Sequence, residues 1–280
     1  MGHERATLHM IGNAHLDPEK ADTVTFGAVF HPSFDWLSGV QLSADYYSVK
    51  VKGAIGQLGV QNITQFCFNG QTALCQYVER DPQAGTLTRV FNPYLNIAQV
   101  KVRGIDVEGQ YLAHPEWLGH QSQTLAVRAF ASRLLERSNI PTPGAPEVRL
   151  DGGFDQSTAA GPVLYPRWKG NMSLGYTMGP WTAQLLEEWI SRSKINVAWV
   201  QGVDVDDNWL PNFFNTNLKL GYSGESFGDH PWEVAVFVTN LFDRDPIIFP
   251  NYNSRTGSQL VSNNYDVYGR SYNLTLNFRW

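Results

Sequence analysis

Cys67 and Cys75 are the residues with the most readily interpreted chemistry, and they lie eight positions apart. Asn69-Gly70 between them favours a tight turn that would bring the two thiols together. We expect a disulfide, which forms in oxidising surroundings such as the cell surface and therefore fits an exported protein. Two free thiols or a pair of metal ligands are the alternatives, but no histidine cluster near them supports a metal.

The acidic segment Asp204-Val205-Asp206-Asp207-Asn208 could offer oxygen ligands to calcium. It lacks the glycine and the distal glutamate of an EF-hand, so we predict a solvated acidic loop and no metal site.

Other titratable groups raise the possibility of hydrolysis, because two carboxylates held about 5 to 10 Å apart in a cleft can cleave a glycosidic bond. No Ser-His-Asp or metal-ligand spacing accompanies these groups, and their positions in alternating segments would place them on the polar, lumen-facing wall of a barrel. We therefore predict no catalytic residue, no enzyme activity and no cofactor. The groups in question are Asp106, Glu108, Glu187, Glu188, His114 and His230.

The final nine residues, 272–280, alternate apolar or aromatic residues with polar ones. Such a pattern fits a half-buried strand of a soluble sheet, and it also fits a transmembrane β-barrel strand with one lipid-facing and one water-facing side. Similar alternation recurs along the chain and predicts nine strands. Their approximate ranges are 22–31, 40–53, 100–112, 122–133, 166–178, 181–190, 213–224, 232–242 and 268–280.

The connections between these strands alternate in length, which favours an outer-membrane barrel with short periplasmic turns and long extracellular loops. The short ones are 32–39, 113–121, 179–180 and 225–231; the long ones are 54–99, 134–165, 191–212 and 243–267. Tryptophans support this interpretation, because indoles favour membrane interfaces. Trp36, Trp117, Trp181, Trp232 and Trp280 lie at short-turn ends, whereas Trp168 and Trp189 lie near the opposite ends. Core tryptophans of a soluble sheet are the alternative.

Composition narrows the class further. The chain has 280 residues, 13% of them aromatic, and a formal net charge of −5, so neither disorder nor a nucleic-acid partner is expected. No apolar run is long enough for a membrane helix. The amino terminus lacks a signal-peptide pattern, so we expect the true start of an exported protein to lie upstream.

Several segments, in this order, resemble the carboxy-terminal half of TonB-dependent outer-membrane receptors. They are Leu16-Asp17-Pro18-Glu19-Lys20-Ala21, Asp45-Tyr46-Tyr47-Ser48-Val49-Lys50-Val51-Lys52, Arg80-Asp81-Pro82 with Gly85, Asn96 with Gly104-Ile105-Asp106-Val107-Glu108, Thr239-Asn240-Leu241-Phe242-Asp243-Arg244-Asp245-Pro246, and Tyr268-Gly269-Arg270-Ser271-Tyr272. In the family, the Asn-Leu-Phe-Asp element closes the penultimate strand at the outer rim.

The resemblance implies an all-β fold, an antiparallel up-and-down meander of about nine strands from a barrel of about 22. Residues 22–280 would be the carboxy-terminal barrel portion and residues 1–21 a remnant of an upstream loop, with no plug domain or TonB box. We therefore expect a truncated gene, a pseudogene-like fragment or a partial gene model. An open wall leaves two unpaired edges, which are costly in hydrocarbon, so we do not expect the chain alone to be competent for transport.

The implied function is energised uptake of a siderophore, cobalamin or an oligosaccharide across the outer membrane of a Gram-negative bacterium. The implied partners are outer-membrane lipid, the barrel-insertion machinery, a small ligand and, through the missing amino-terminal part, TonB. The last strand resembles the assembly signal read by that machinery, at Tyr272, Leu274, Leu276, Phe278 and Trp280. Ligand-binding residues cannot be assigned. The alternatives are a soluble β-rich carbohydrate-binding or hydrolytic domain and a small self-contained porin or adhesin barrel.

Overall fold

The structure is a computed structural model that describes residues 7–34, 37–116, 122–140, 146–155, 163–226, 230–247, 265 and 268–278. The strands are β1 (Thr7–Ile11), β2 (Lys20–Phe30), β3 (Val40–Gln57), β4 (Val78–Arg80), β5 (Leu87–Ala113), β6 (Gln123–Ile140), β7 (Val148–Arg149), β8 (Gly153–Asp155), β9 (Val163–Tyr165), β10 (Trp168–Met178), β11 (Trp181–Ile190), β12 (Ser193–Lys194), β13 (Trp209–Leu210), β14 (Phe213–Ser226), β15 (His230–Thr239) and β16 (Ser271–Phe278). The helices are α1 (Val60–Phe68) and the 3₁₀ helix η2 (Thr72–Tyr77).

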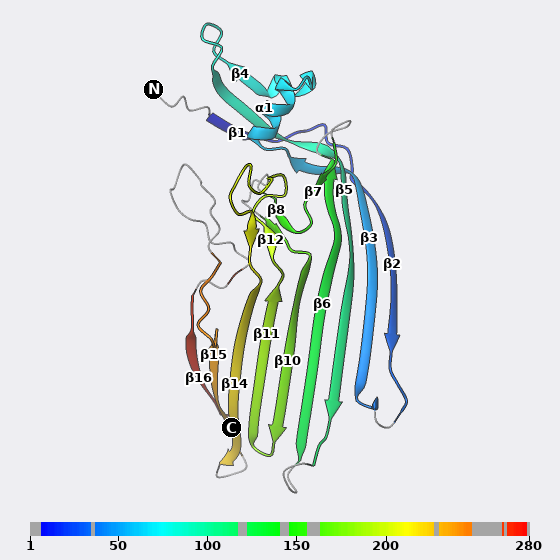
Figure 1. Cartoon of the computed structure of the whole chain (residues 1–280), viewed down its shortest axis with the longest axis vertical. Coiled ribbons are helices and arrows are strands. Elements are labelled where there is room, and N and C mark those ends of the chain that lie inside the picture. The colour runs from blue at the N-terminus through cyan, green and yellow to red at the C-terminus, as the bar shows by residue number, and fades with distance from the viewer. Residues whose placement is uncertain are drawn as a thin grey trace.

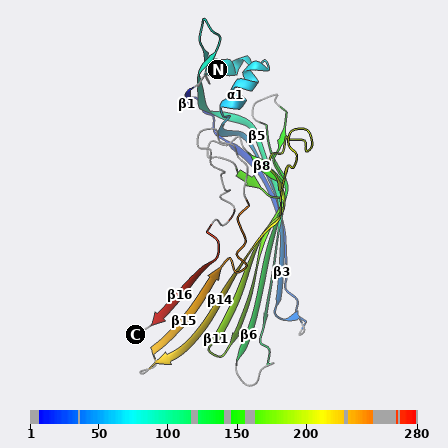
Figure 2. The same cartoon turned by 60° about the vertical axis from the view of Figure 1, so that its left-hand side comes forward.

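Nine long strands form one antiparallel meander in the order β2-β3-β5-β6-β10-β11-β14-β15-β16. The predicted all-β meander is therefore confirmed, and every expected strand has an observed counterpart, although β5 and β6 are longer than expected. Figure 1 shows the strands as a tall wall, and the turned view in Figure 2 shows how the wall curves. Within the described residues β2 and β16 end the sheet without pairing with each other, so the wall is part of a barrel and is not closed.

The connections alternate in length as expected. The tight β10–β11 turn consists of Gly179, whose φ of 53° suits glycine, followed by Pro180. The strand ends that flank the other short connections lie at this same end of the wall, at the bottom of Figure 1, and the strand ends that flank the long connections lie at the other end. Phe278 of β16 pairs with Trp232 near the start of β15, so the last strand runs toward the short-turn end.

The long connections contain more structure than the sequence predicts. Residues 7–11, expected in a loop, form β1 and pair in parallel with residues 89–93 of β5. β5 begins at Leu87, well before the expected position 100, and β6 continues to Ile140. These extensions lie past a register shift between Arg103 and Gly104. Because β5 continues upward, its edges are available to β1 and β4.

The register sorts the side chains of the wall into two faces, because successive residues of a strand point to opposite sides. One face is apolar across all nine strands; its members include Val24, Phe26, Leu42, Tyr46, Ile105, Val107, Val127, Met172, Leu174, Leu185, Leu218, Leu220, Val234, Val236, Leu274 and Leu276. The other face is mostly polar; it includes Asp45, Asp106, Glu108, Arg128, Ser132, Lys169, Asn171, Glu188, Asn215, Asn217, Lys219, Glu233, Asn273, Thr275 and Asn277.

The apolar face is strongly exposed, which a water-soluble domain does not tolerate over so large an area. Phe26 is 73% exposed and Leu274 is 66% exposed, at opposite edges of the wall. We refer to this face as the outer face and to the polar one as the lumenal face. No helix in the described parts of the chain is long and apolar enough to cross a bilayer.

Aromatic side chains mark both ends of the apolar band on the outer face. Near the short turns, Trp181 contacts Tyr222 and Tyr222 contacts Trp232, with ring centroids 4.6 and 5.7 Å apart. Near the long connections, Trp189 lies 6.4 Å from Trp168 in the same way. The eight residue steps from Trp181 to Trp189 span about 26 Å along the strand, close to the apolar band height of outer-membrane barrels. Trp36, Trp117 and Trp280 lie outside the described residues.

Two small cores stabilise the long connections. One packs Phe154, Leu164, Ile195, Leu210, Phe213 and Tyr265. The other, under α1, packs Leu58, Ile63, Leu74 and Val90. Both lie at the end of the wall away from the short turns, so they form a cap on that rim.

Candidate functional site

The lumenal face carries charged side chains that pair across neighbouring strands. Arg128 of β6 donates from Nε to Glu108 of β5 at 2.7 Å, and Lys219 of β14 lies 2.9 Å from Glu233 of β15. A second β5 carboxylate, Asp106, faces Asp45 of β3 across the ladder. A wall of charged and polar side chains suits a water-filled interior, in which such groups are hydrated.

A pocket of about 630 Å³ lies where the lumenal face meets the cap, and we call it the vestibule pocket. Asn139 of β6 lines it from a lumenal register position, since it pairs with Val100 of β5 and with Val148 of β7. Its other walls come from α1 and from the two long connections above β6 and β11. The lining residues are Leu58, Gly59, Val60, Gln61, Asn62, Phe66, Asn139, Val148, Leu150, Phe154, Asn196, Val197, Ala198 and Trp199.

The chemistry of the vestibule pocket is aromatic and amide-rich. Phe66, Phe154 and Trp199 supply ring faces, and Asn62, Asn139 and Asn196 supply amides. The Oδ1 atom of Asn139 is buried and has no hydrogen-bond partner among the described residues. Buried acceptors are normally satisfied, so this oxygen needs a partner that the described residues do not supply. Sequence reasoning missed this pocket, because its walls come from segments far apart in the chain.

Asn208 holds the wall of the vestibule pocket that contains Asn196 and Trp199. The Asn208 amide donates to both of their backbone oxygens at 2.9 Å, and its Oδ1 accepts from the Asn196 N–H at 3.1 Å. Asn208 is 1% exposed. In the same segment Asp204 accepts a hydrogen bond from the Val200 N–H at 2.8 Å. The segment considered for calcium thus contains groups that shape a loop.

The carboxylates considered for hydrolysis do not all share the lumenal face. Glu188 is lumenal and lies between Asn171 and Asn215 in the register, whereas its neighbour Glu187 points to the outer face, opposite Met172. The expectation that both face the lumen is therefore wrong for Glu187. Its side chain accepts a hydrogen bond from the Thr216 hydroxyl. The described residues contain no group of three or more His, Cys, Asp or Glu arranged to hold a metal.

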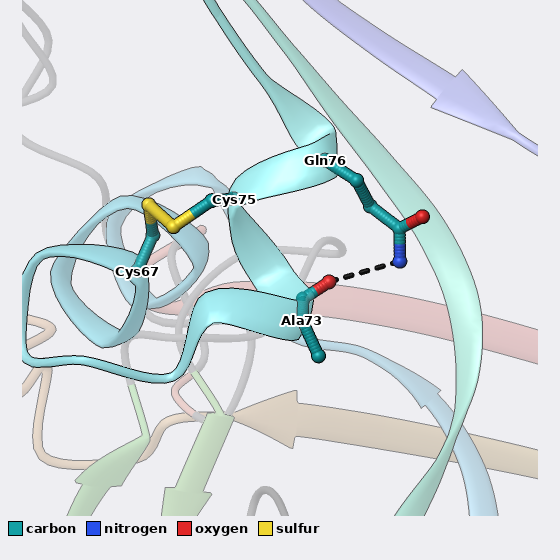
Figure 3. Close-up of a disulfide and its surroundings, with 4 residues drawn as sticks. All are labelled: Cys67, Ala73, Cys75 and Gln76. Carbon is teal, nitrogen blue, oxygen red and sulfur yellow. Dashed lines mark hydrogen bonds between the residues drawn. A yellow bond between two sulfur atoms is a disulfide. The ribbon is translucent and has the colours of Figure 1, made fainter.

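The structure places Cys67 and Cys75 as a disulfide, with Cα atoms 4.9 Å apart. Cys67 lies in the last turn of α1 and Cys75 in η2, so the bond joins the two helices of the cap (Figure 3). The turn at Gly70, with a φ of 96°, reverses the chain between them. Gln76 donates to the backbone oxygen of Ala73 at 2.9 Å beside the bond.

Replacing both cysteines with serine is expected to destabilise the cap by about 2 to 3 kcal/mol. The disulfide closes a loop between cysteines eight positions apart, and without it the unfolded chain gains conformational entropy. Hydrogen exchange of the α1 amides measures this. Exchange should accelerate in the double variant and, to the same extent, in the reduced wild-type protein. Unchanged exchange in both would show that the cap does not depend on the bond.

The Asn240–Asp243 turn closes β15 at the rim. Asn240 and Asp243 both have a φ of 52°, a conformation that Asn and Asp tolerate better than most residues. Asn240 exchanges two hydrogen bonds with the backbone of Arg244, both at 2.8 Å, and Asp243 accepts from the Arg270 N–H at 3.0 Å. The turn therefore positions the chain that begins β16, and it lies at the rim where the resemblance places it.

The last strand presents Tyr272, Leu274, Leu276 and Phe278 on the outer face, opposite Val238, Val236, Val234 and Trp232. Trp280 lies outside the described residues. Recognition of this strand by an insertion machinery stays a prediction.

Comparison with known proteins agrees with this geometry. Residues 6–241 match the family model described as the TonB dependent receptor-like β-barrel. No curated protein matches the sequence. Similar solved structures include a mutant ferric enterobactin receptor, PfeA, from Pseudomonas aeruginosa, with 14% identity and a TM-score of 0.57. The siderophore receptor PirA from Acinetobacter baumannii has 14% identity and a TM-score of 0.52.

The outer membrane transporter YddB from Escherichia coli has 11% identity and a TM-score of 0.50. The matches cover 95% of this chain for PfeA and PirA and 99% for YddB, but 32%, 32% and 34% of those structures. This chain thus spans about a third of the length of these proteins. The matched family is one of receptors and transporters and is not an enzyme family. The chain belongs to the family of TonB-dependent receptor β-barrels.

Proposed function

We propose that this protein forms part of the barrel wall of a receptor in the outer membrane of a Gram-negative bacterium, where it lines the route of a ligand taken up with energy from TonB. The observation that carries the proposal is the register of the nine strands, which gives an apolar face bounded by aromatic side chains and an opposite face of charges and amides. Such a wall can separate lipid from a watery passage.

In this proposal the vestibule pocket contacts the ligand as it enters from outside. Aromatic rings and amides suit a ligand with flat rings and several hydrogen-bonding groups, as catechol siderophores and cobalamin have, and also the apolar ring faces and hydroxyls of an oligosaccharide. We favour a siderophore, because the titles of two similar structures name a ferric enterobactin receptor and a siderophore receptor. The family model that the chain matches describes the receptor β-barrel. The TonB system would therefore act through a plug domain outside these 280 residues.

Uptake assays test this function. Cells in which the chromosomal gene encoding this chain is intact or deleted are given radiolabelled ferric enterobactin, cyanocobalamin or maltoheptaose. We expect uptake of one probe, ferric enterobactin first, to require both this gene and TonB. Uptake of all three that is indifferent to the gene would contradict the proposal.

A variant pair locates the passage within the vestibule pocket. Trp199→Ala should lower uptake roughly tenfold through loss of one stacking surface. Phe68→Ala should not, because Phe68 is 85% exposed and does not line the pocket. The amount of each variant in the outer membrane is measured by immunoblot, so that a folding defect is distinguished from a loss of uptake.

A further inference from the structure

Trp168 and Trp189, the upper aromatic side chains, mark the end of the apolar band near the long connections. Beyond them, the outer face changes from apolar to basic. Two adjoining pockets of about 690 and 440 Å³ lie there and share Arg149. We call their basic side chains the outer basic band: Lys50, Lys101, Arg103, Arg149, Arg167, Arg192 and Lys194. Four carboxylates accompany them, so seven positive charges face four negative ones: Glu136, Glu147, Asp151 and Asp22, which lies opposite Lys50 in the register. This local surplus stands out in a chain whose formal net charge is −5.

The strand register shows that these basic residues lie on the outer face and how far they lie beyond the apolar residues. Lys50 and Lys101 are paired across β3 and β5, and Ser48 and Arg103 are the next pair on that face. Two residues further along β3 comes Tyr46, which belongs to the apolar outer face. The basic positions therefore begin roughly 7 Å and end roughly 13 Å beyond Tyr46 along the strand, which is the depth of lipid head groups.

The second pocket continues this level sideways. Trp168, one of the upper aromatic side chains, lines it, and the guanidinium of Arg133 lies over the Trp168 ring at 5.2 Å. Trp209 lines the same pocket and contacts two of its cations. The guanidinium of Arg192 lies 4.7 Å from the centroid of the Trp209 ring, and Nζ of Lys194 lies 5.8 Å from it. The basic band is thus continuous with the aromatic boundary of the apolar surface.

Buried carboxylates lie behind the cations and orient them. Glu136, with a side chain 8% exposed, accepts from Nε of Arg103 at 2.6 Å, while the Arg103 side chain stays 46% exposed. Asp151, 4% exposed, lies 2.7 Å from Nε of Arg149 and 3.4 Å from Arg167, whose side chains are 53% and 66% exposed. Arg103 uses Nε and Nη2 on Glu136, and Arg149 uses Nε on Asp151 and Nη2 on the Leu135 backbone oxygen, so the exposed remainder of each guanidinium is what can bind phosphate.

The protonation state of Asp151 supports this arrangement. Burial alone would raise the pKa of the Asp151 carboxyl, but the hydrogen bond and the charge of Arg149 outweigh burial, so this pKa lies below its ordinary value. Asp151 stays ionised at neutral pH and holds both arginines in place.

We propose that the outer basic band binds the phosphate groups of a phosphorylated glycolipid in the outward leaflet of the surrounding membrane. A lipid is favoured over a soluble anion because the band adjoins the apolar surface that acyl chains would cover, so one molecule can use both. This inference rests on the proposed outer-membrane location and goes beyond it, since ligand uptake on the lumenal face does not require it.

Native mass spectrometry of the purified chain in detergent micelles tests the proposal with diphosphoryl lipid A and its fully dephosphorylated form. We expect the diphosphoryl form to bind at least about tenfold more tightly, with an affinity that falls as salt rises. Equal affinity for the two forms would overturn the proposal. Complete displacement by millimolar inorganic phosphate would also overturn it, because the site would then recognise a free anion. Both readouts use the unmodified protein.

Two matched triple variants locate the site. Lys50→Gln with Arg192→Gln and Lys194→Gln removes three charges from the band and leaves the arginines that hold buried carboxylates. Arg128→Gln with Lys169→Gln and Lys219→Gln removes three charges from the lumenal face. The first should lose diphosphoryl lipid A affinity about tenfold or more, and the second should stay within about twofold. Unchanged binding in the first, or an equal loss in the second, would refute the assignment.

Fractionation distinguishes this inference from the proposed function. A protein found in the outer membrane that does not distinguish phosphorylated from dephosphorylated lipid would overturn only the lipid site. A protein that binds diphosphoryl lipid A in micelles but is absent from the outer membrane would overturn only the proposed location and function.

Discussion

Arginine in place of Leu185 is expected to destabilise the protein in a bilayer by about 2 to 4 kcal/mol, the cost of a cation at the midplane of a barrel's lipid face. Leu185 lies on β11 midway between Trp181 and Trp189, with Leu174 and Leu218 on either side of it. Its partners across both ladders are apolar, and the nearest charge on this face, Glu187 two positions along β11, is already hydrogen-bonded to Thr216. The arginine would have to draw water into the hydrocarbon or extend toward an interface.

Leu186→Arg provides the matched control, because the substitution is identical and the position is adjacent. Leu186 points to the lumenal face and lies between Ser173 and Asn217, so its arginine would be hydrated and should cost less than about 1 kcal/mol. Urea unfolding in phosphatidylcholine vesicles, followed by tryptophan fluorescence, compares the two. If both arginines lowered the free energy of unfolding equally, the two faces of the wall would be in the same solvent.

Truncation of Phe154 to alanine is expected to cost the cap about 3 to 5 kcal/mol, the range for deleting a buried aromatic ring. Phe154 is 1% exposed, packs in the core with Phe213 and Tyr265, and lines the vestibule pocket. Its loss should therefore loosen the pocket wall as well as the core. Hydrogen exchange of residues 153–155 and 193–195 measures the effect.

Phe68→Ala is the control for this variant, since Phe68 is exposed and its removal should leave exchange unchanged. Tyr265 supplies a second readout, because burial raises the pKa of its phenol to about 12. In Phe154→Ala that pKa should fall toward the ordinary value near 10. If exchange and the Tyr265 titration both stay as in the wild type, the loop core does not depend on Phe154.

The Tyr265 pKa also predicts how the cap responds to alkali. A phenol with a raised pKa in the folded state contributes its full stabilisation below about pH 10, where the unfolded chain also keeps the proton. That stabilisation is lost as the pH rises from about 10 to about 12. The cap should therefore loosen in this interval, in which the carboxylates are already ionised.

The nine strands of the wall were predictable because lipid and water impose the period of two directly on the sequence. The Val234 and Val236 positions on β15 and the Leu274 and Leu276 positions on β16 show this, since each pair is apolar for the same reason and meets across the ladder. The side of Glu187 could have been read in the same way. Odd-numbered residues of β11, such as Leu185 and Trp189, lie on the outer face, and Glu187 is one of them. The prediction that Glu187 faces the lumen overlooked this alternation.

The cap was not predictable by the same reasoning. β1 pairs with residues of β5 about eighty positions away, and no local pattern encodes that contact. Helix α1 is only nine residues long and is stabilised by the burial of Ile63 in the small core beneath the helix. Asn208 looks like an ordinary loop asparagine until its three hydrogen bonds are known. The pocket that these parts form was therefore missed, whereas the wall beneath it was found.

The most direct test of the two-faced wall is a spin-label scan along β11, from Thr182 to Trp189, with the protein in bilayers and labels placed on single introduced cysteines. Cys67 and Cys75, bonded to each other, would not react with the label. Labels at positions 183, 185, 187 and 189 should collide mainly with oxygen dissolved in lipid, and those at 182, 184, 186 and 188 mainly with a water-soluble nickel chelate. Collision rates that do not alternate along the strand would contradict the account.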